Sequence, residues 1–251
     1  AITLGKREEA EEFAIRREKL NKLIHQTFYR ADEGIYSTGS QSDMCYPMLV
    51  GVVPDSLYNK VKENVVAMTE EKYKGHIAVG LVGVPILTEW AVRNKQVDFF
   101  YQMMKKRDYP GYLYMIDHGA TATWEYWSGE RSRVHNCYNG IGTWFYQAVG
   151  GIRLDEANSG YRHFYVDPQT PNGVTWAKVT KESPYGTIAV NWKLKDDNQL
   201  NLQLTVPAGT TATVCIPNNA VSCKKNKKKV SVKEQTVDVE AGHYDFLFNL
   251  K

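Results

Sequence analysis

The chain has 251 residues, of which 43% are hydrophobic and 24% are charged, and its formal net charge is +3. This balance is typical of a globular protein with a sizeable core, and the small charge gives no reason to expect nucleic acid as a partner. No apolar run is long enough to span a bilayer, so no membrane span is expected. Neither a metal nor a cofactor is expected, because zinc-ligand spacing is absent from the four cysteines, Cys45, Cys137, Cys215 and Cys223.

The first part of the sequence has the period of helices. Apolar residues at three- and four-residue steps between Ala10 and Phe28 predict one amphipathic helix over residues 5–30, followed by a turn at residues 32–34. A second helix is predicted over residues 43–53, and a third starts at Pro54 and continues at least to Met68. Further helices are predicted over residues 77–93, 95–106 and 139–150.

Beyond Gly160 the period changes to two, and β-branched and aromatic residues become frequent. Turn signals at residues 171–173, at Asp196-Asp197-Asn198 and at residues 207–209 separate short predicted strands. These strands cover residues 161–166, 174–180, 186–194, 199–206, 211–216, 229–232, 235–239 and 243–250. Short strands at this spacing predict an antiparallel β-sandwich. The fold class is therefore α+β in two parts, with a helical part over residues 1–155 and a β-sandwich over residues 156–251.

The one basic cluster lies at residues 224–229, where five lysines surround Asn226. Such a run can bind a polyanion or can form the solvated tip of a hairpin. The hairpin tip is the favoured interpretation, because the run is short and has no aromatic residues within it.

The segment over residues 109–127 differs most from ordinary sequence. It joins two predicted helices, is too long for a simple connector, and places Glu125 between Trp124 and Trp127. Sugars present apolar C–H faces and hydroxyls, so their sites combine aromatic rings with acidic partners. The alternative is that both tryptophans belong to the core, and that Glu125 caps a helix or pairs with Arg131.

Residues 119–127, Gly-Ala-Thr-Ala-Thr-Trp-Glu-Tyr-Trp, resemble the Gly-Ala-Thr-Thr-x-Trp-Glu-Arg-Trp motif of the α-L-rhamnosidases, glycoside hydrolase family 78. Residues 134–140 and 144–146 resemble the Asn-His-x-x-x-Gly and Trp-x-Tyr elements of this family. Residues 37–41 resemble its Gly-Thr-Gln element, and further matches continue into the predicted sandwich at Trp176, Tyr185 and Trp192. The resemblance covers nearly the whole chain in the right order.

The resemblance implies an α/α toroid of six helix pairs followed by a C-terminal β-sandwich, and cleavage of terminal α-L-rhamnosides with inversion. It implies that Glu125 is the general base and that His135 contacts the sugar, although His135 could also be a capping residue. His76 is a further candidate for substrate contact, with a hydrogen-bonding role at a helix N-terminus as the alternative. Trp124 and Trp127 complete the expected substrate-binding set. The expected partners are glycosides or polysaccharides that contain rhamnose.

The chain also departs from the family pattern. Tyr126, Ala122 and Val134 replace the usual arginine, threonine and asparagine, which puts the aglycone preference in doubt. No Asp-x-x-x-Arg-x-Glu-like element, which carries the general acid of the family, occurs in the chain, and Asp117 aligns with no acid of the family. The sequence therefore predicts about half of a toroid plus the sandwich. It further predicts that the chain alone is inactive, and that an upstream half or another copy of the chain is a partner.

Two other functions stay open at this point. The first is a carbohydrate-binding remnant without turnover, and the second is a related toroid glycosidase with another sugar preference. Residues 1–9 do not resemble a signal peptide, and the compartment is not given by the sequence, although the periplasm or the extracellular space is favoured.

Overall fold

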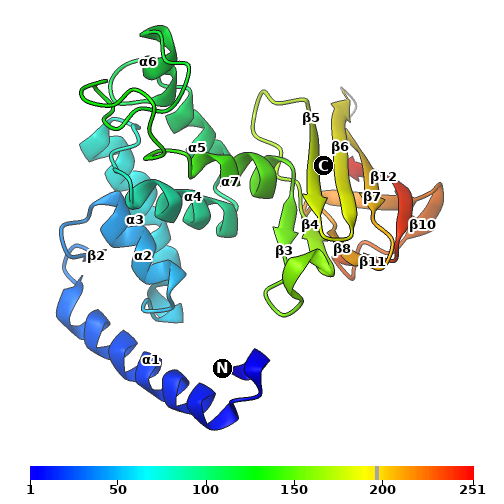
Figure 1. The fold of residues 1–251 in the computed structure, drawn as a ribbon, viewed down its shortest axis with the longest axis horizontal. Helices are drawn as coiled ribbons and strands as arrows, with labels where there is room; N and C mark the ends of the chain where they lie inside the picture. The colour runs from blue at the N-terminus through cyan, green and yellow to red at the C-terminus, as the bar shows by residue number, and fades with distance from the viewer. Residues whose placement is uncertain (196–197) are drawn as a thin grey trace. The chain divides into compact units, whose positions relative to one another are not determined.

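The computed structural model describes residues 1–195 and 198–251 (Figure 1). The turn predicted at Asp196 and Asp197 lies outside the described residues. The chain forms two compact units, of which unit 1 comprises residues 1–94 and 99–140 and unit 2 comprises residues 95–98 and 141–251. Within the described residues, no helix combines the length and the apolar character that a membrane crossing requires.

Unit 1 is helical, as predicted, and contains the short β1–β2 hairpin. Its elements in chain order are η1 (Ile2–Leu4), α1 (Arg7–Phe28), β1 (Tyr29–Arg30), β2 (Ile35–Tyr36), α2 (Gln41–Leu49), α3 (Asp55–Tyr73), α4 (Gly83–Arg93), α5 (Val97–Met104) and α6 (Tyr112–Asp117). The short helix α6 was not predicted, because six residues give too few turns for a periodic pattern.

The helix expected over residues 77–93 begins only at Gly83. A buried side chain of α2 binds the backbone ahead of it. Gln41 donates from Nε2 to the carbonyl of His76 at 2.9 Å and accepts at Oε1 from the amide of Ala78 at 2.8 Å. These bonds tie the backbone at residues 76 and 78 to α2, and residues 76–82 are non-helical.

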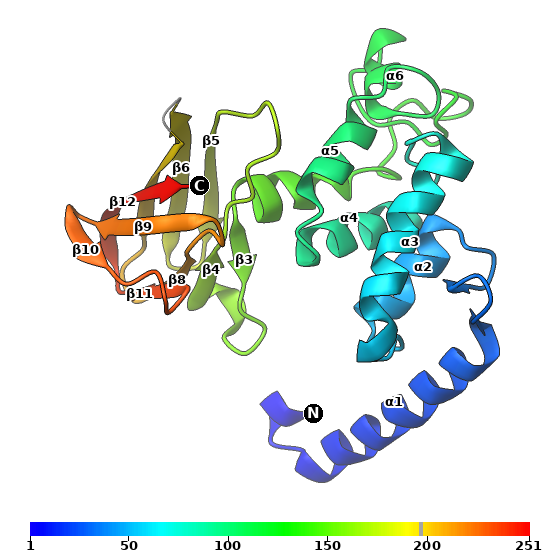
Figure 2. The same cartoon turned by 180° about the vertical axis from the view of Figure 1, so that it is seen from behind.

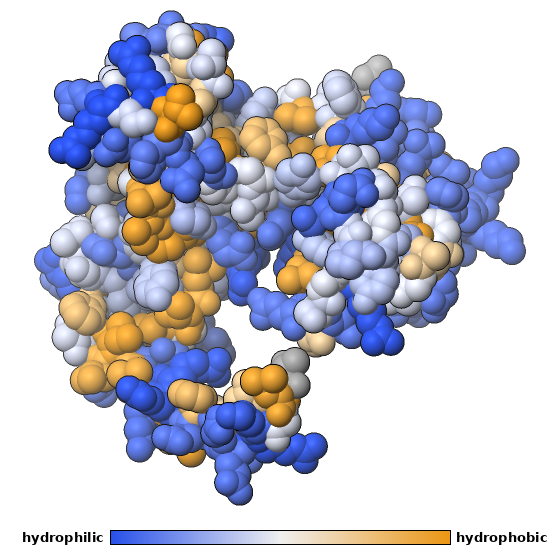
Figure 3. All heavy atoms as spheres, in the orientation of Figure 1, coloured by the Kyte–Doolittle hydropathy of each residue, from blue (hydrophilic) through white to orange (hydrophobic). Residues whose placement is uncertain are grey.

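Helix α1 has none of its residues buried, although the sequence predicted an amphipathic helix with an apolar face. Phe13 is 60% exposed, and Ile15, Leu20 and Leu23 are also exposed. In Figure 3, apolar side chains are visible at the surface over the part of the chain that contains α1 and α2. The periodicity predicted the helix correctly, whereas burial depends on what packs against it.

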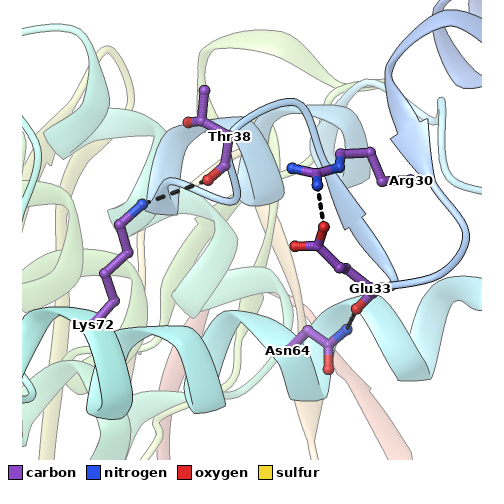
Figure 4. Close-up of polar contacts among 5 residues, drawn as sticks. All are labelled: Arg30, Glu33, Thr38, Asn64 and Lys72. Atoms are coloured by element: carbon purple, nitrogen blue, oxygen red, sulfur yellow. Dashed lines mark hydrogen bonds and ion pairs between the residues drawn. The ribbon is translucent and has the colours of Figure 1, made fainter.

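The β1–β2 hairpin after α1 is fixed to α3 by polar contacts (Figure 4). Asn64 on α3 donates to the carbonyls of Gly34 at 2.8 Å and Glu33 at 3.3 Å, and the Glu33 carboxylate pairs with Arg30 within the hairpin. Farther along α3, Lys72 donates to the carbonyl of Thr38 at 3.5 Å. The hairpin thus turns the chain from α1 into α2.

The core of unit 1 lies among α2, α3 and α4. The side chains buried there include Met44, Cys45, Met48, Val61, Val65, Leu87 and Trp90. The ring of Trp90 donates from Nε1 to the sulfur of Met48 at 3.0 Å, which links α4 to α2. Burial of large apolar side chains provides most of the stability of such a helical layer.

Unit 2 consists mainly of two sheets (Figure 2). It starts with α7 (Ile141–Thr143), the π-helix η2 (Trp144–Val149), β3 (Ile152–Leu154) and η3 (Ser159–Tyr161). The strands that follow are β4 (His163–Val166), β5 (Trp176–Ser183), β6 (Gly186–Lys195), β7 (Gln199–Val206), β8 (Thr211–Cys215), β9 (Ala220–Lys225), β10 (Lys228–Val230), β11 (Thr236–Val239) and β12 (Gly242–Leu250).

The six-stranded sheet has the order β10-β9-β12-β7-β6-β5, and the four-stranded sheet has the order β11-β8-β4-β3. All neighbours are antiparallel except β4 and β8, which are parallel. Two described strands of unit 2 were missed by the sequence analysis, as were the two-residue strands β1 and β2 of unit 1. Strand β3 has only three residues, and β9 ends in Lys224 and Lys225 of the basic cluster, which hide its alternation. The predicted hairpin tip at that cluster is present between β9 and β10.

The inward side chains of both sheets form the core of unit 2. The six-stranded sheet contributes residues such as Val190, Trp192, Leu202 and Phe246, and the four-stranded sheet contributes Phe164, Val166, Val214 and Val237. Trp192 also donates from Nε1 to the carbonyl of Val149 at 2.7 Å, which fixes the π-helix to the sheet. The division that the sequence predicts at residue 155 falls between β3 and β4, which pair with one another, and it stays a prediction.

Candidate functional site

Glu125 lies on a loop over residues 118–140 that turns back on itself. The amide of His135 donates to the carbonyl of Thr123 at 2.8 Å, and the amide of Glu125 donates to the carbonyl of Ser132 at 2.9 Å. The hydroxyl of Thr123 also lies 2.7 Å from Oδ1 of Asn139. These bonds fix the backbone on both sides of Glu125 although the segment is neither helix nor strand.

Among the described residues, the carboxylate of Glu125 makes only long polar contacts. The nearest cation is Nη1 of Arg131, at 3.7 Å from Oε1, and the amide of Ser132 lies 3.4 Å from Oε2. The Glu125 side chain is 27% exposed and that of Arg131 is 69% exposed. An exposed partner at this distance contributes little energy, so the carboxylate keeps the capacity to accept a further hydrogen bond or a proton.

Trp124 and Trp127 are both buried, with 2% and 8% of their surface exposed. Trp127 stacks on Tyr138 with 3.8 Å between the ring centroids, meets Tyr112 edge-on, and donates from Nε1 to the carbonyl of Val79 at 2.9 Å. Burial raises the pKa of Tyr138 to about 12 and keeps its phenol neutral. The sequence analysis gave such core packing of the tryptophans as the alternative to sugar contact. These contacts anchor the loop to the core of unit 1.

Trp124 is covered by residues that the sequence analysis did not single out. The guanidinium of Arg133 lies over its ring at 5.0 Å, and Gly129 lies so close that a Cβ there would come within 2.7 Å of the ring. Gly129 has a φ of +78°, a conformation that side chains rarely adopt. A glycine and an arginine just after a Trp-Glu pair were the only signal that could have revealed this packing.

His135 is half-buried, and its ring is oriented by Cys137. The amide of Cys137 donates to Nδ1 at 3.2 Å, and the Cys137 sulfur lies 2.9 Å from the same nitrogen. Because a backbone amide can only donate, Nδ1 is the acceptor and the proton of a neutral ring is on Nε2. Among the described residues Nε2 has no polar partner, so this nitrogen is free to donate to a ligand. His135 therefore also has the turn-capping contact that the sequence analysis kept as the alternative.

His76 and Asp117 both have partners elsewhere in unit 1. His76 is buried in the non-helical segment before α4, with Nδ1 2.8 Å from the carbonyl of Pro110 and Nε2 3.2 Å from the carboxylate of Asp108. It therefore holds the start of the 109–127 segment at Pro110, the residue before Gly111, which is the N-cap of α6. Asp117 accepts two hydrogen bonds from Arg107, at 2.6 Å and 2.8 Å.

The described residues contain no group of three or more His, Cys, Asp or Glu side chains that could hold a metal ion. All four cysteines are free thiols, and burial raises the pKa of Cys45 and that of Cys215. The polar side chains that the loop offers for chemistry are the partly exposed carboxylate of Glu125 and the imidazole of His135.

Comparison with known proteins decides the family. A family model described as the bacterial alpha-L-rhamnosidase 6 hairpin glycosidase domain matches residues 1–149, and one described as the bacterial alpha-L-rhamnosidase C-terminal domain matches residues 151–231. The chain belongs to the bacterial α-L-rhamnosidase family. The order of a helical glycosidase part and a β-rich C-terminal part confirms the fold class that the sequence predicted.

Individual relatives are distant but cover the chain well. An α-L-rhamnosidase of Formosa agariphila is 28% identical in an alignment of 272 positions. This alignment covers 98% of this chain and 29% of the relative. Another from Streptomyces avermitilis is 30% identical over 203 residues, which cover 76% of this chain and 19% of the relative. The chain thus spans less than a third of the length of these relatives.

Two solved structures are similar in fold. The α-L-rhamnosidase of Streptomyces avermitilis complexed with L-rhamnose matches with a TM-score of 0.88 and 25% identity, over 98% of this chain and 25% of that one. The α-L-rhamnosidase of Dictyoglumus thermophilum matches with a TM-score of 0.89 and 20% identity, over 99% of this chain and 30% of that one. At 20% identity the latter shows the shared fold alone.

Proposed function

We propose that this chain is the part of an inverting α-L-rhamnosidase that carries the general base, and that this base is Glu125. The observation that supports the proposal is the state of the Glu125 carboxylate. Backbone bonds at Thr123 and Ser132 fix its position, yet within the described part of the chain its own oxygens have only polar contacts of 3.4 Å and 3.7 Å. A fixed carboxylate that retains free acceptor capacity is suited to take a proton from an attacking water.

His135 is the proposed sugar contact beside the base. Its free Nε2–H can donate to a hydroxyl of the substrate, because Cys137 occupies Nδ1. Trp124 and Trp127 were expected to touch the sugar, but rings this deeply buried support the loop more directly than they can stack on a substrate. We propose that they act on the substrate through the position of Glu125. We give His76 a similar indirect role through Asp108 and Pro110.

The proton donor is proposed to lie outside residues 1–251. An inverting glycosidase needs a second carboxyl group, roughly 6.5–9.5 Å from the base, to protonate the leaving oxygen. The Asp117 carboxylate is held by Arg107. The relatives are more than three times as long as their match to this chain, so a parent protein of their size would have room for the donor.

The first experiment is Glu125→Gln in a parent protein of that length, assayed with an aryl α-L-rhamnoside. Loss of general-base catalysis is expected to lower kcat by about 10²–10⁴-fold while the melting temperature stays unchanged. Glu130→Gln is the matched control, because Glu130 is an exposed carboxylate on the same loop. Activity of Glu125→Gln within tenfold of the parent would contradict the assignment.

A second experiment distinguishes a base from a residue that merely shapes the site. In Glu125→Ala, added azide is expected to restore turnover, because the azide anion attacks carbon without a base to deprotonate it. The product should be a rhamnosyl azide of inverted configuration at the anomeric carbon, as NMR can show. Binding of rhamnose without turnover in the intact parent would instead favour the carbohydrate-binding remnant, and a preference for another aryl glycoside would favour the related toroid glycosidase.

The 251-residue chain by itself is expected to show no enzymatic turnover of the aryl rhamnoside. Assay of the purified chain, followed by addition of a separately expressed upstream half, measures this directly. Robust turnover by the chain alone would mean that it already contains the proton donor.

A further inference from the structure

The outer face of the six-stranded sheet in unit 2 carries an ordered row of polar side chains. The strand register places Lys178 on β5 opposite Asn191 on β6, Asn191 opposite Gln203 on β7, and Gln203 opposite Asp245 on β12. Asn191 donates to Oε1 of Gln203 at 3.1 Å, and Gln203 donates to Oδ1 of Asp245 at 3.2 Å. We call Asn191, Gln203 and Asp245 the amide ladder.

A second row runs parallel to the amide ladder on the same face. It consists of Trp176 on β5, Lys193 on β6, Asn201 on β7, Leu247 on β12 and Lys224 on β9, which are opposite one another in register. Trp176 is 63% exposed at one end of this row. The row crosses four strand spacings, about 19 Å, which is the length of a short oligosaccharide rather than of a single sugar.

The face is hollowed on both sides of the amide ladder. One hollow of about 540 Å³ is lined by the ladder together with Lys193, Asn201, Lys224 and Lys227. A second hollow of about 390 Å³ is lined by the ladder together with Lys178, Thr205 and His243. The ladder therefore forms the wall that both hollows share. The two hollows together are large enough for several sugar rings.

The residue types on this face are unusual for a sheet that only contacts water. One face of an antiparallel sheet is commonly solvated, and threonine and other β-formers normally occupy it. Asparagine and aspartate are depleted in strands, yet they occupy outward positions of the three neighbouring strands β6, β7 and β12 at Asn191, Asn201 and Asp245. All three line the larger hollow, so contact with a ligand is a reason for such poor strand formers to occur there.

The chemistry of the lining indicates the class of ligand. The amides and the Asp245 carboxylate provide acceptors and donors for hydroxyl groups. Asp245 is the one carboxylate in the lining of the two hollows, and the excess of positive charge attracts anions. The lysines that supply this charge are Lys178, Lys193, Lys224 and Lys227. A ligand that satisfies both sets carries hydroxyls and negative charges along a chain.

We propose that this face binds an acidic polysaccharide, one that bears carboxylate or sulfate groups on its sugars. The site lies on unit 2, is built without Glu125 and His135, and is distinct from the proposed rhamnosidase site. It gives the basic cluster at residues 224–229 a function, because Lys224 and Lys227 line the larger hollow. The aromatic residue that the cluster lacks in sequence is supplied in register by Trp176.

The test uses the whole 251-residue chain and measures binding by isothermal titration calorimetry at low and high salt. The ligands are polygalacturonate, its carboxyl-reduced form, dextran sulfate and dextran. Binding of polygalacturonate or dextran sulfate is expected to exceed that of the matched neutral polymer and to weaken as salt rises. Preference for one of the two acidic polymers identifies the charged group. Equal binding of charged and neutral polymers, or none of any, would overturn the proposal.

Variants locate the site on this face. Lys193→Glu combined with Lys224→Glu is expected to weaken binding by about tenfold or more. Lys19→Glu combined with Lys233→Glu is the matched control, because it changes the net charge equally at exposed positions away from the hollows. Equal loss in both pairs would mean that the net charge of the chain, and not this face, attracts the polymer. Glu125→Gln should bind as the unmodified chain does, so failure of this proposal leaves the rhamnosidase proposal intact.

Asp245→Ala separates sugar recognition from simple attraction of charge. Removing a negative charge should strengthen the binding of any polyanion to a purely electrostatic site. A site that uses the carboxylate to accept sugar hydroxyls should instead lose affinity, by about fivefold to tenfold. Tighter binding of polygalacturonate and dextran sulfate to Asp245→Ala, or equal affinity for short duplex DNA, would contradict the proposal. Far-UV circular dichroism checks that the variant is folded.

Discussion

The loop over residues 118–140 and the six-stranded sheet present polar groups in two different ways. On the loop, Glu125 and His135 are held by a few specific bonds and by buried rings beneath them. On the sheet, the amide ladder is placed by the regular strand register. The loop can position a single carboxylate for chemistry, whereas the sheet repeats similar groups at even spacing, which suits an extended ligand. Removal of a supporting side chain should therefore destabilise the loop much more than the sheet.

Removal of a tryptophan from each region gives the largest expected difference. Trp127→Ala should lower the free energy of unfolding of unit 1 by about 3–5 kcal/mol, because it leaves a cavity next to Tyr112 and Tyr138 and removes the bond to Val79. Trp176→Ala should change the unfolding free energy by at most about 0.5 kcal/mol, since the ring is exposed. Urea unfolding followed by far-UV circular dichroism measures both. Similar losses would mean that the loop is not held by its rings.

Two glycine-to-alanine substitutions compare the packing of the loop and of unit 2 by adding a Cβ atom to each. Gly129→Ala should destabilise unit 1 by about 3 kcal/mol, because the new Cβ meets the Trp124 ring at 2.7 Å and the backbone has a φ of +78°. Gly173→Ala in unit 2 carries only the backbone cost of its φ of +91°, about 1 kcal/mol, since nothing lies within 4 Å of its Cβ position. Thermal unfolding would contradict the packing at Trp124 if the two variants were equally stable.

The proposed role of His135 predicts a smaller effect. His135→Ala should lower kcat/KM for an aryl rhamnoside in the parent protein by about fivefold to tenfold, the equivalent of one hydrogen bond of about 1 kcal/mol. His163→Ala is the control, because His163 bonds to Thr211 and Thr213 within the sheets of unit 2. Unchanged kinetics in His135→Ala, with a lower melting temperature, would leave His135 only its capping contact with Cys137.

The smallest expected effect concerns acid stability. Burial alone would raise the pKa of Asp43, but hydrogen bonds with Thr38 and Ser40 outweigh it and hold this pKa below the usual value. A carboxyl group whose pKa is lower in the folded than in the unfolded state contributes stability at pH values above its unfolded pKa. That contribution is lost as the pH falls through the folded pKa. Asp43→Asn should therefore flatten the loss of stability between about pH 4 and pH 2. A curve of melting temperature against pH that is as steep as that of the unmodified chain would exclude this contribution.

Much of the fold could be predicted because it depends on local patterns. The apolar spacing from Ala10 to Phe28 predicted α1, and the alternation in β6 and β7 predicted both strands to within a few residues. The errors in the predicted helices and strands occurred where a residue far away in the sequence determines the local structure. The backbone at residues 76 and 78 is bound by the distant Gln41 and lies outside α4, and the three-residue β3 pairs with β4. The parallel pairing of β4 with β8 likewise had no local signal.

The sequence by itself determined the family, the order of a helical and a β-rich part, and the motif that contains Glu125. It could do so because helical and strand periods and a nine-residue motif are properties of neighbouring residues. Only the tertiary structure decided that Trp124 and Trp127 are buried supports, that Cys137 orients His135, and that Asn191, Gln203 and Asp245 form one ladder. Each of these depends on which distant backbone or side chain is the neighbour, and chain folding sets those neighbours through packing and strand register.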